Sequence, residues 1–291
     1  MIALTAGDWR ATLAPDMGGA MLSLDWRGRP VLRPTPDGAT DILQTSCFPL
    51  VPYANRIANG RFVFEGRSVR LPVLERFASH AIHGEGWLQP WTIQSRSSDV
   101  VAMTLDWQGE PAGWPWPWRA KQVVSLADSG LEIELSVTNA GDEIMPAGLG
   151  LHPYFHRHPH SRLALTASGV LATNAFDLPD RFISPLDLVD WSSGRALNEV
   201  PFVDHAYGGW NGVARMTGGS CEVVMKASSS AAWVQVYAPT DTDFFCVEPV
   251  THCPDAFNGP VSWGGSANGL VALKPGETLT IHMTVSASAR D

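Results

Sequence analysis

Apolar and polar residues alternate in three separate segments, and this pattern constrains the fold more than any other feature of the sequence. In residues 131–139, apolar side chains occupy every second position from Leu131 to Val137. Residues 278–286 and 232–239 alternate in the same way. Because successive side chains of a strand point to opposite faces, a period of two predicts half-buried β-strands. Long stretches with the 3.6-residue period of an amphipathic helix are absent from the sequence.

Turn-forming residues divide the remaining chain into short segments. Residues 61–71 predict a hairpin with Glu65 and Gly66 at its turn. The 27 glycines and 22 prolines are spread between short apolar segments, as is typical of loops that join strands. Residues 111–119 hold prolines that cannot donate to a sheet, so we expect a surface loop or an edge there. The sequence therefore predicts an all-β fold, an antiparallel sandwich with few short helices, formed as a single domain over residues 1–291.

Charge and composition exclude several classes of protein. The chain has 20 basic and 29 acidic residues, a formal net charge of −9, and no cluster of basic residues. It is therefore a poor candidate for binding nucleic acid or an anionic membrane. The first residues lack the features of a signal peptide, and no apolar run approaches the roughly 18 residues of a spanning helix. Four cysteines in so long a chain make no disulfide framework, so we expect a cytoplasmic protein with reduced thiols.

The chain has 12 tryptophans, which is an unusually large number. Most of them are expected to be large side chains of a sandwich core. Alternatively, some could form flat apolar platforms for the C–H faces of a sugar ring, because burying such a surface is favourable.

Two loop segments place unusual polar residues between predicted strands. In residues 51–62, Arg56 follows Asn55, and a half-buried guanidinium there would offer several donors to ligand oxygens. In residues 79–91, His83 precedes a glycine, which allows the backbone to come close to a ligand. On local sequence alone a structural role is favoured for each: Arg56 could satisfy loop carbonyls, and His83 could be an ordinary surface or core residue.

A third segment, residues 148–160, places His152 at the end of an apolar strand and directly before a proline. Strand ends and loops are where rigid β scaffolds hold catalytic groups. His156, His158 and His160 follow in alternation. Such a tract can bind metal, but the sequence shows no second cluster that would complete a site, so we expect no metal and a solvated loop.

A fourth segment, residues 244–258, places Glu248 directly after an apolar run. Apolar walls raise the pKa of a carboxyl towards that of a useful base, although an edge glutamate facing solvent would fit the sequence too. His252 and Cys253 follow, without the remaining ligands of a metal site. The four segments contain no phosphate-binding loop, dinucleotide fingerprint or nucleophile elbow, and they suit proton transfer on a neutral, hydroxyl-rich ligand.

In this order, the segments resemble the aldose 1-epimerase, or galactose mutarotase-like, family. The matching pieces are NRIANGRF (55–62), HGEGW (83–87), HPYF (152–155), VDHAY (203–207), QVY (235–237) and EPVTHCPDAFN (248–258). The resemblance implies a large antiparallel β-supersandwich with a sugar site in a concave cleft. It also implies that His152 is the general acid and Glu248 the general base, on opposite sides of the hemiacetal carbon.

The same resemblance implies a set of substrate-binding residues. Arg56 and His83 would contact the sugar near its reacting end, Asp204 would bind hydroxyl groups, and Gln235 would add a polar contact. Asn55 matches the residue beside the binding arginine. Many galactose-type members have HxYFN where this chain has His156 after HPYF, so the identity of the sugar stays open.

The expected function is thus interconversion of the α and β anomers of a free aldose, a small-molecule monosaccharide. Proton transfer would need a protonated His152 and an ionised Glu248 together, and no cofactor. Three alternatives remain: a mutarotase for a phosphorylated or acidic sugar, a non-catalytic sugar-binding protein of the same fold, and a lyase or other carbohydrate-processing enzyme. The sequence leaves open whether the chain is a monomer or a homodimer.

Overall fold

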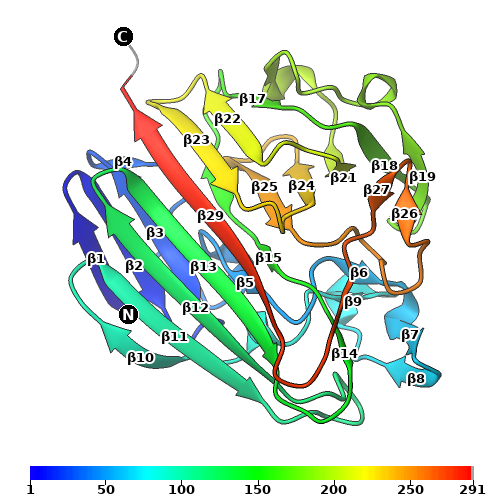
Figure 1. Ribbon diagram of the computed structural model, residues 1–291. Helices are drawn as coiled ribbons and strands as arrows, with labels where there is room; N and C mark the ends of the chain where they lie inside the picture. The colour runs from blue at the N-terminus through cyan, green and yellow to red at the C-terminus, as the bar shows by residue number, and fades with distance from the viewer. Residues whose placement is uncertain (290–291) are drawn as a thin grey trace.

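Two of the alternating segments pair with each other at the centre of a nine-stranded antiparallel sheet (Figure 1). The computed structural model describes residues 1–289, and in it Leu135 lies directly opposite Ile281. Both side chains are fully buried, as the alternation predicted. In spatial order, the strands of this sheet are β10 (Thr92–Arg96), β11 (Val100–Trp107), β12 (Trp118–Ala127), β13 (Gly130–Asn139), β29 (Thr278–Ser288), β23 (Glu222–Ala227), β22 (Val213–Thr217), β17 (Arg162–Leu165) and β20 (Arg195–Ala196).

Two further antiparallel sheets share a hydrophobic core with the nine-stranded sheet. The four-stranded sheet contains β1 (Ile2–Ala6), β2 (Trp9–Ala14), β3 (Ala20–Trp26) and β4 (Arg29–Pro30). The eight-stranded sheet contains β19 (Pro179–Ile183), β18 (Gly169–Thr173), β21 (Val203–Gly208), β24 (Trp233–Ala238), β25 (Phe244–Val250), β15 (Gly150–Leu151) and β5 (Pro49–Leu50), with β16 (Tyr154–His156) also paired to β25.

The eight-stranded sheet is buried on both of its faces near its centre. Val234 and Val236 of β24 join the core that the large sheets share. Trp233 and Gln235, on the other face of the same strand, are buried as well. The prediction of a half-buried strand at residues 232–239 is therefore correct for the strand and wrong for its burial, because loops and short elements cover the second face.

Short elements complete the structure of residues 1–289. Small two-stranded sheets are formed by β6 (Arg56–Ile57) with β9 (Ala81–Ile82), β7 (Arg61–Phe64) with β8 (Arg67–Arg70), β14 (Met145–Ala147) with β28 (Val271–Leu273), and β26 (Ser262–Trp263) with β27 (Ser266–Ala267). The helices are short 3₁₀ turns: η1 (Ile42–Gln44), η2 (Ala58–Gly60), η3 (Glu75–Phe77), η4 (Gly86–Leu88), η5 (Pro185–Asp187) and η6 (Leu197–Glu199).

The hairpin expected in residues 61–71 is confirmed as β7 and β8. Glu65 and Gly66 at its turn have φ angles of 47° and 80°. Two consecutive positive φ angles match the twist of a tight hairpin turn.

The segment at residues 111–119 differs from its prediction. It is irregular up to Pro117, as its prolines require, but it is not a surface loop. Trp114 and Trp116 are buried and pack against the ring of Phe62, which explains why the segment lies against the body of the protein. Most tryptophans are core side chains in the same way, as expected for a large sandwich.

The all-β sandwich prediction is confirmed, whereas the single-domain boundary stays a prediction. Among residues 1–289, no helix has both the length and the apolar character needed to cross a membrane.

The β13–β29 contact gives a test of the core. We expect Leu135→Ala to lower the free energy of unfolding by about 2–5 kcal/mol, because it leaves a cavity under a fully buried side chain. Ser136→Ala, on the other face of β13, should change it by less than about 0.5 kcal/mol. Urea denaturation measures both, and equal effects of the two substitutions would contradict the assigned faces.

Candidate active site

A cavity of about 250 Å³ lies on the face of the eight-stranded sheet that points away from the shared core. Its apolar wall includes Phe77, Tyr154, Tyr237 and Phe244, and among the described residues no tryptophan lines it. All seven residues that the sequence indicated are brought together in its lining: Asn55, Arg56, His83, His152, Asp204, Gln235 and Glu248.

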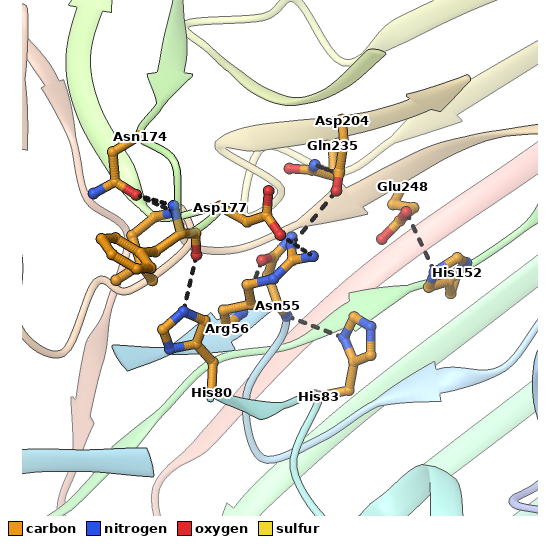
Figure 2. Close-up of polar contacts among 12 residues, drawn as sticks. Asn55, Arg56, His80, His83, His152, Asn174, Asp177, Asp204, Gln235 and Glu248 are labelled. Atoms are coloured by element: carbon orange, nitrogen blue, oxygen red, sulfur yellow. Dashed lines mark hydrogen bonds and ion pairs between the residues drawn. The ribbon is translucent and has the colours of Figure 1, made fainter. Parts of the chain in front are cut away.

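Strand pairing places three of these side chains side by side (Figure 2). Gln235 of β24 lies directly opposite Glu248 of β25, so both side chains leave the sheet on the cavity face. Gln235 Nε2 donates a hydrogen bond of 2.5 Å to Asp204 Oδ1 of the neighbouring strand β21. The Oε1 atom of Gln235 is buried without a partner, which leaves an acceptor for a ligand hydroxyl.

His152 and Glu248 form a close pair deep in the cavity. The Nε2 and Oε1 atoms are 3.4 Å apart, and only 9% and 4% of the two side chains are exposed. The imidazole is held between the rings of Phe48 and Tyr154, each with its centroid 4.7 Å away. A gap of 3.4 Å has no room for a sugar carbon, so the expectation that the two groups lie on opposite sides of that carbon is wrong. They lie next to each other instead.

Burial acts on this pair in opposite directions. It lowers the pKa of His152 to about 3, and the positive charge of Arg33 adds to this effect. It raises the pKa of Glu248 well above 4.5; the charge of Asp204 adds to this, and Arg56 opposes it. Burial therefore disfavours the expected charge state, a protonated His152 with an ionised Glu248. With one shared proton the pair has no net charge, whereas two protons or none would leave a buried charge.

Two neighbouring segments place Arg56, in β6, and His83, directly after β9, beside the pair, and the centroids of the His83 and His152 rings are 5.5 Å apart. His83 Nδ1 accepts a 3.1 Å hydrogen bond from the Asn55 amide, so the ring proton is on Nε2, where it can be donated to a ligand. Asn55 Oδ1 accepts from the Arg56 amide, which gives Asn55 a role in shaping the loop. Both Asn55 and His83 have positive φ angles, 58° and 64°. The Arg56 guanidinium lies 3.5 Å from a carboxylate oxygen of Asp204 and 3.5 Å from one of Asp177.

His252, which the sequence offered as part of a metal site, positions the loop before Arg56 instead. Its Nε2 accepts a 3.1 Å hydrogen bond from the Ala54 amide, and its Nδ1 donates to the Cys253 carbonyl at 2.7 Å. Burial lowers its pKa to about 4, so the ring is neutral at pH 7. A side chain at Gly148 would collide with the imidazole ring, which explains the glycine.

One group of potential metal ligands is present in the part of the chain that the structure describes. The ligand atoms of His152, Cys246 and Glu248 lie within 4.8 Å of one another, and all three residues are buried. An ion there would occupy both groups that are suited to proton transfer, so the donor set fits an acid–base pair better. The histidine tract at residues 156–160 does not join any such group.

Sequence reasoning missed two residues beside the site, Asp177 and His80. Asp177 contacts Arg56 from a hairpin loop, and His80 accepts a hydrogen bond from the amide of Asn59, three residues after Arg56. Neither contact has a local sequence signal, because each depends on segments far apart in the chain.

Comparisons with known proteins agree on the fold and the family. A family model described as aldose 1-epimerase matches residues 1–286. The uncharacterized Escherichia coli protein YphB is 34% identical over 283 residues, which cover 93% of each chain. A crystal structure of a candidate aldose 1-epimerase from E. coli has a TM-score of 0.88 at 30% identity, covering 99% of this chain and 98% of that one. A galactose mutarotase-like protein from Clostridium acetobutylicum has a TM-score of 0.86 at 20% identity, with 99% and 95% covered, and shows the fold alone.

The contribution of the His252 hydrogen bonds to stability can be tested with a substitution that keeps a ring of similar size. His252→Phe keeps a ring but leaves the Ala54 amide and the Cys253 carbonyl buried and unpaired. We expect the free energy of unfolding to fall by about 1–3 kcal/mol for each group left without a partner. His160→Phe is a matched control at an exposed position of the histidine tract. Urea denaturation that gave both variants the stability of the wild type would contradict this role.

Proposed function

This chain belongs to the aldose 1-epimerase family, and we propose that it interconverts the α and β anomers of a free, neutral aldose. The observation that supports this most is the buried pair of His152 and Glu248, 3.4 Å apart at the end of a small cavity. The other polar groups of the lining, above all His83 and Gln235, offer donors and acceptors for sugar hydroxyls.

The geometry of a hemiacetal explains why the acid and the base would be neighbours. The C1 hydroxyl and the ring oxygen are both bonded to C1, so groups that reach both oxygens must lie close together. In the proposed reaction, Glu248 removes the proton of the C1 hydroxyl while His152 protonates the ring oxygen. The ring opens to the aldehyde, rotation about C1–C2 presents the other carbonyl face, and the proton transfers reverse.

These roles need the shared proton to be on His152 when the ring opens. Because burial favours the neutral forms of both groups, it favours the proton on Glu248, so the proposed reaction includes its transfer across the 3.4 Å gap to His152. The attraction of Arg56 for an ionised Glu248 helps this transfer. All atoms and charges balance within the pair and the sugar.

The phosphorylated-sugar alternative has little support in the cavity. Arg56 is the basic residue of the lining, and its guanidinium lies near two carboxylates. Arg119 is exposed and paired with Asp106, and Arg157 donates to backbone carbonyls; neither lines the cavity. A cavity of about 250 Å³ also suits one sugar ring better than a polysaccharide.

Substitution of the pair tests the proposal against a non-catalytic sugar-binding protein. We expect His152→Asn and Glu248→Gln each to lower the anomerisation rate by about 10²–10⁴-fold, the usual contribution of a positioned acid or base. Polarimetry on freshly dissolved α-glucose, α-galactose and α-xylose gives the rate above the spontaneous one. His160→Asn, outside the cavity, is the control. Sugar binding without faster anomer exchange in the wild type would contradict the proposal.

The pH profile should reflect a pair that shares one proton. Activity should fall at low pH, when both groups hold protons, and at high pH, when neither does. Independent groups would give an active window only between the ordinary pKa values of 4.5 and 6.5. Because burial lowers the pKa of His152 and raises that of Glu248, we expect a plateau that extends beyond this interval on both sides. An optimum confined to the interval between 4.5 and 6.5 would show that burial does not control the pKa values of His152 and Glu248.

A further inference from the structure

The loop between β18 and β19 lies beside Arg56, which lines the cavity (Figure 2). Its conformation is fixed by Asn174, whose Oδ1 accepts hydrogen bonds from the amides of Phe176 and Leu178. Asp177, at the end of this loop, has a φ of 57°, in the left-handed region that aspartate and asparagine tolerate.

His80 ties this loop to the segment that follows Arg56. Its Nδ1 accepts a 3.1 Å hydrogen bond from the Asn59 amide, so its proton is on Nε2. Nε2 then donates to the Phe176 carbonyl at 2.9 Å. His80 itself is 6% exposed, and both of its hydrogen bonds are partly buried. Asp177, which follows Phe176, is therefore held in place beside Arg56.

The loop adds a negative charge beside Arg56, and we call this solvent-exposed edge of the site the rim. The Oδ2 atom of Asp177 is 3.5 Å from a terminal nitrogen of Arg56, and Asp204 approaches the other terminal nitrogen at the same distance. Side-chain exposure rises from 4% for Glu248 to 20% for Asp204 and 67% for Asp177. With C1 of the sugar at Glu248, we place the end of the sugar remote from C1 towards Asp177, so Arg56 lies further from C1 than the family resemblance implies.

We propose that Asp177 is a specificity-determining residue that selects neutral sugars by repelling a negative group at the end of the sugar remote from C1. The proposal rests on the proposed function for the orientation of the ring. Asp177 occupies one side of the Arg56 guanidinium that a phosphate or carboxylate would otherwise bind. Two carboxylates around one guanidinium leave the rim with a net negative charge.

Asp177→Asn tests the charge without a change of shape, since asparagine also tolerates the positive φ. We expect the ratio of kcat/KM for a hexose 6-phosphate to that for the neutral hexose to rise about tenfold, the effect of removing one like charge at the surface. Uronic acids should respond in the same direction. The gain should shrink at high salt, because the rim is exposed to solvent.

Asp180→Asn is the matched control, because Asp180 is an exposed aspartate of the same hairpin that pairs with Arg181 instead of Arg56. Its ratio should equal that of the wild type. An unchanged ratio in Asp177→Asn, or an equal rise in both variants, would overturn the proposal. Calorimetric affinities for the same two sugars give the ratio even if the wild type anomerises neither, so failure of the proposed function and failure of the Asp177 proposal are distinguishable.

Discussion

The pairing of β24 with β25 is the constraint on which the rest of the site depends. In this register Gln235 lies opposite Glu248 on the cavity face, while Val236 and Val247 enter the shared core on the other face. Because side chains alternate along a strand, a shift of one residue would bury Glu248 among apolar side chains and turn a valine into the cavity. The packing of Val236 and Val247 in the apolar core therefore fixes the position of the Glu248 carboxylate in the cavity.

Burial then determines how many protons the acid–base pair holds. Neither His152 nor Glu248 is well solvated, so a single proton shared between them avoids any net buried charge. Around the pair, Arg56 lies between Asp177 and Asp204, so two carboxylates face one guanidinium and negative charge is in excess. The cavity thus combines reactive groups with little attraction for anions, which is the combination that a neutral polyhydroxylated ligand requires.

Much of the fold and of the candidate site could be predicted from the sequence, because alternation and polar residues at strand ends are local signals. Such signals indicate the strands around Leu135 and Ile281 and most of the lining residues, whereas Asp204 and Gln235 follow only from the family resemblance. The double burial of β24 and the packing of Trp114 depend on which segments cover which face, and no local pattern encodes that. Asp177 and the charge state of the His152 pair depend on contacts and burial that exist only in the folded chain.

Two-dimensional exchange NMR on an equilibrated aldose tests the central claim most directly, because it observes the conversion of one anomer into the other without any coupled reaction. With catalytic amounts of the protein at neutral pH, the account predicts exchange cross-peaks between the α and β anomeric protons of a neutral hexose or pentose, at a rate proportional to protein concentration. Line broadening that reported sugar binding, with exchange no faster than in buffer, would show that this cavity binds sugars without anomerising them.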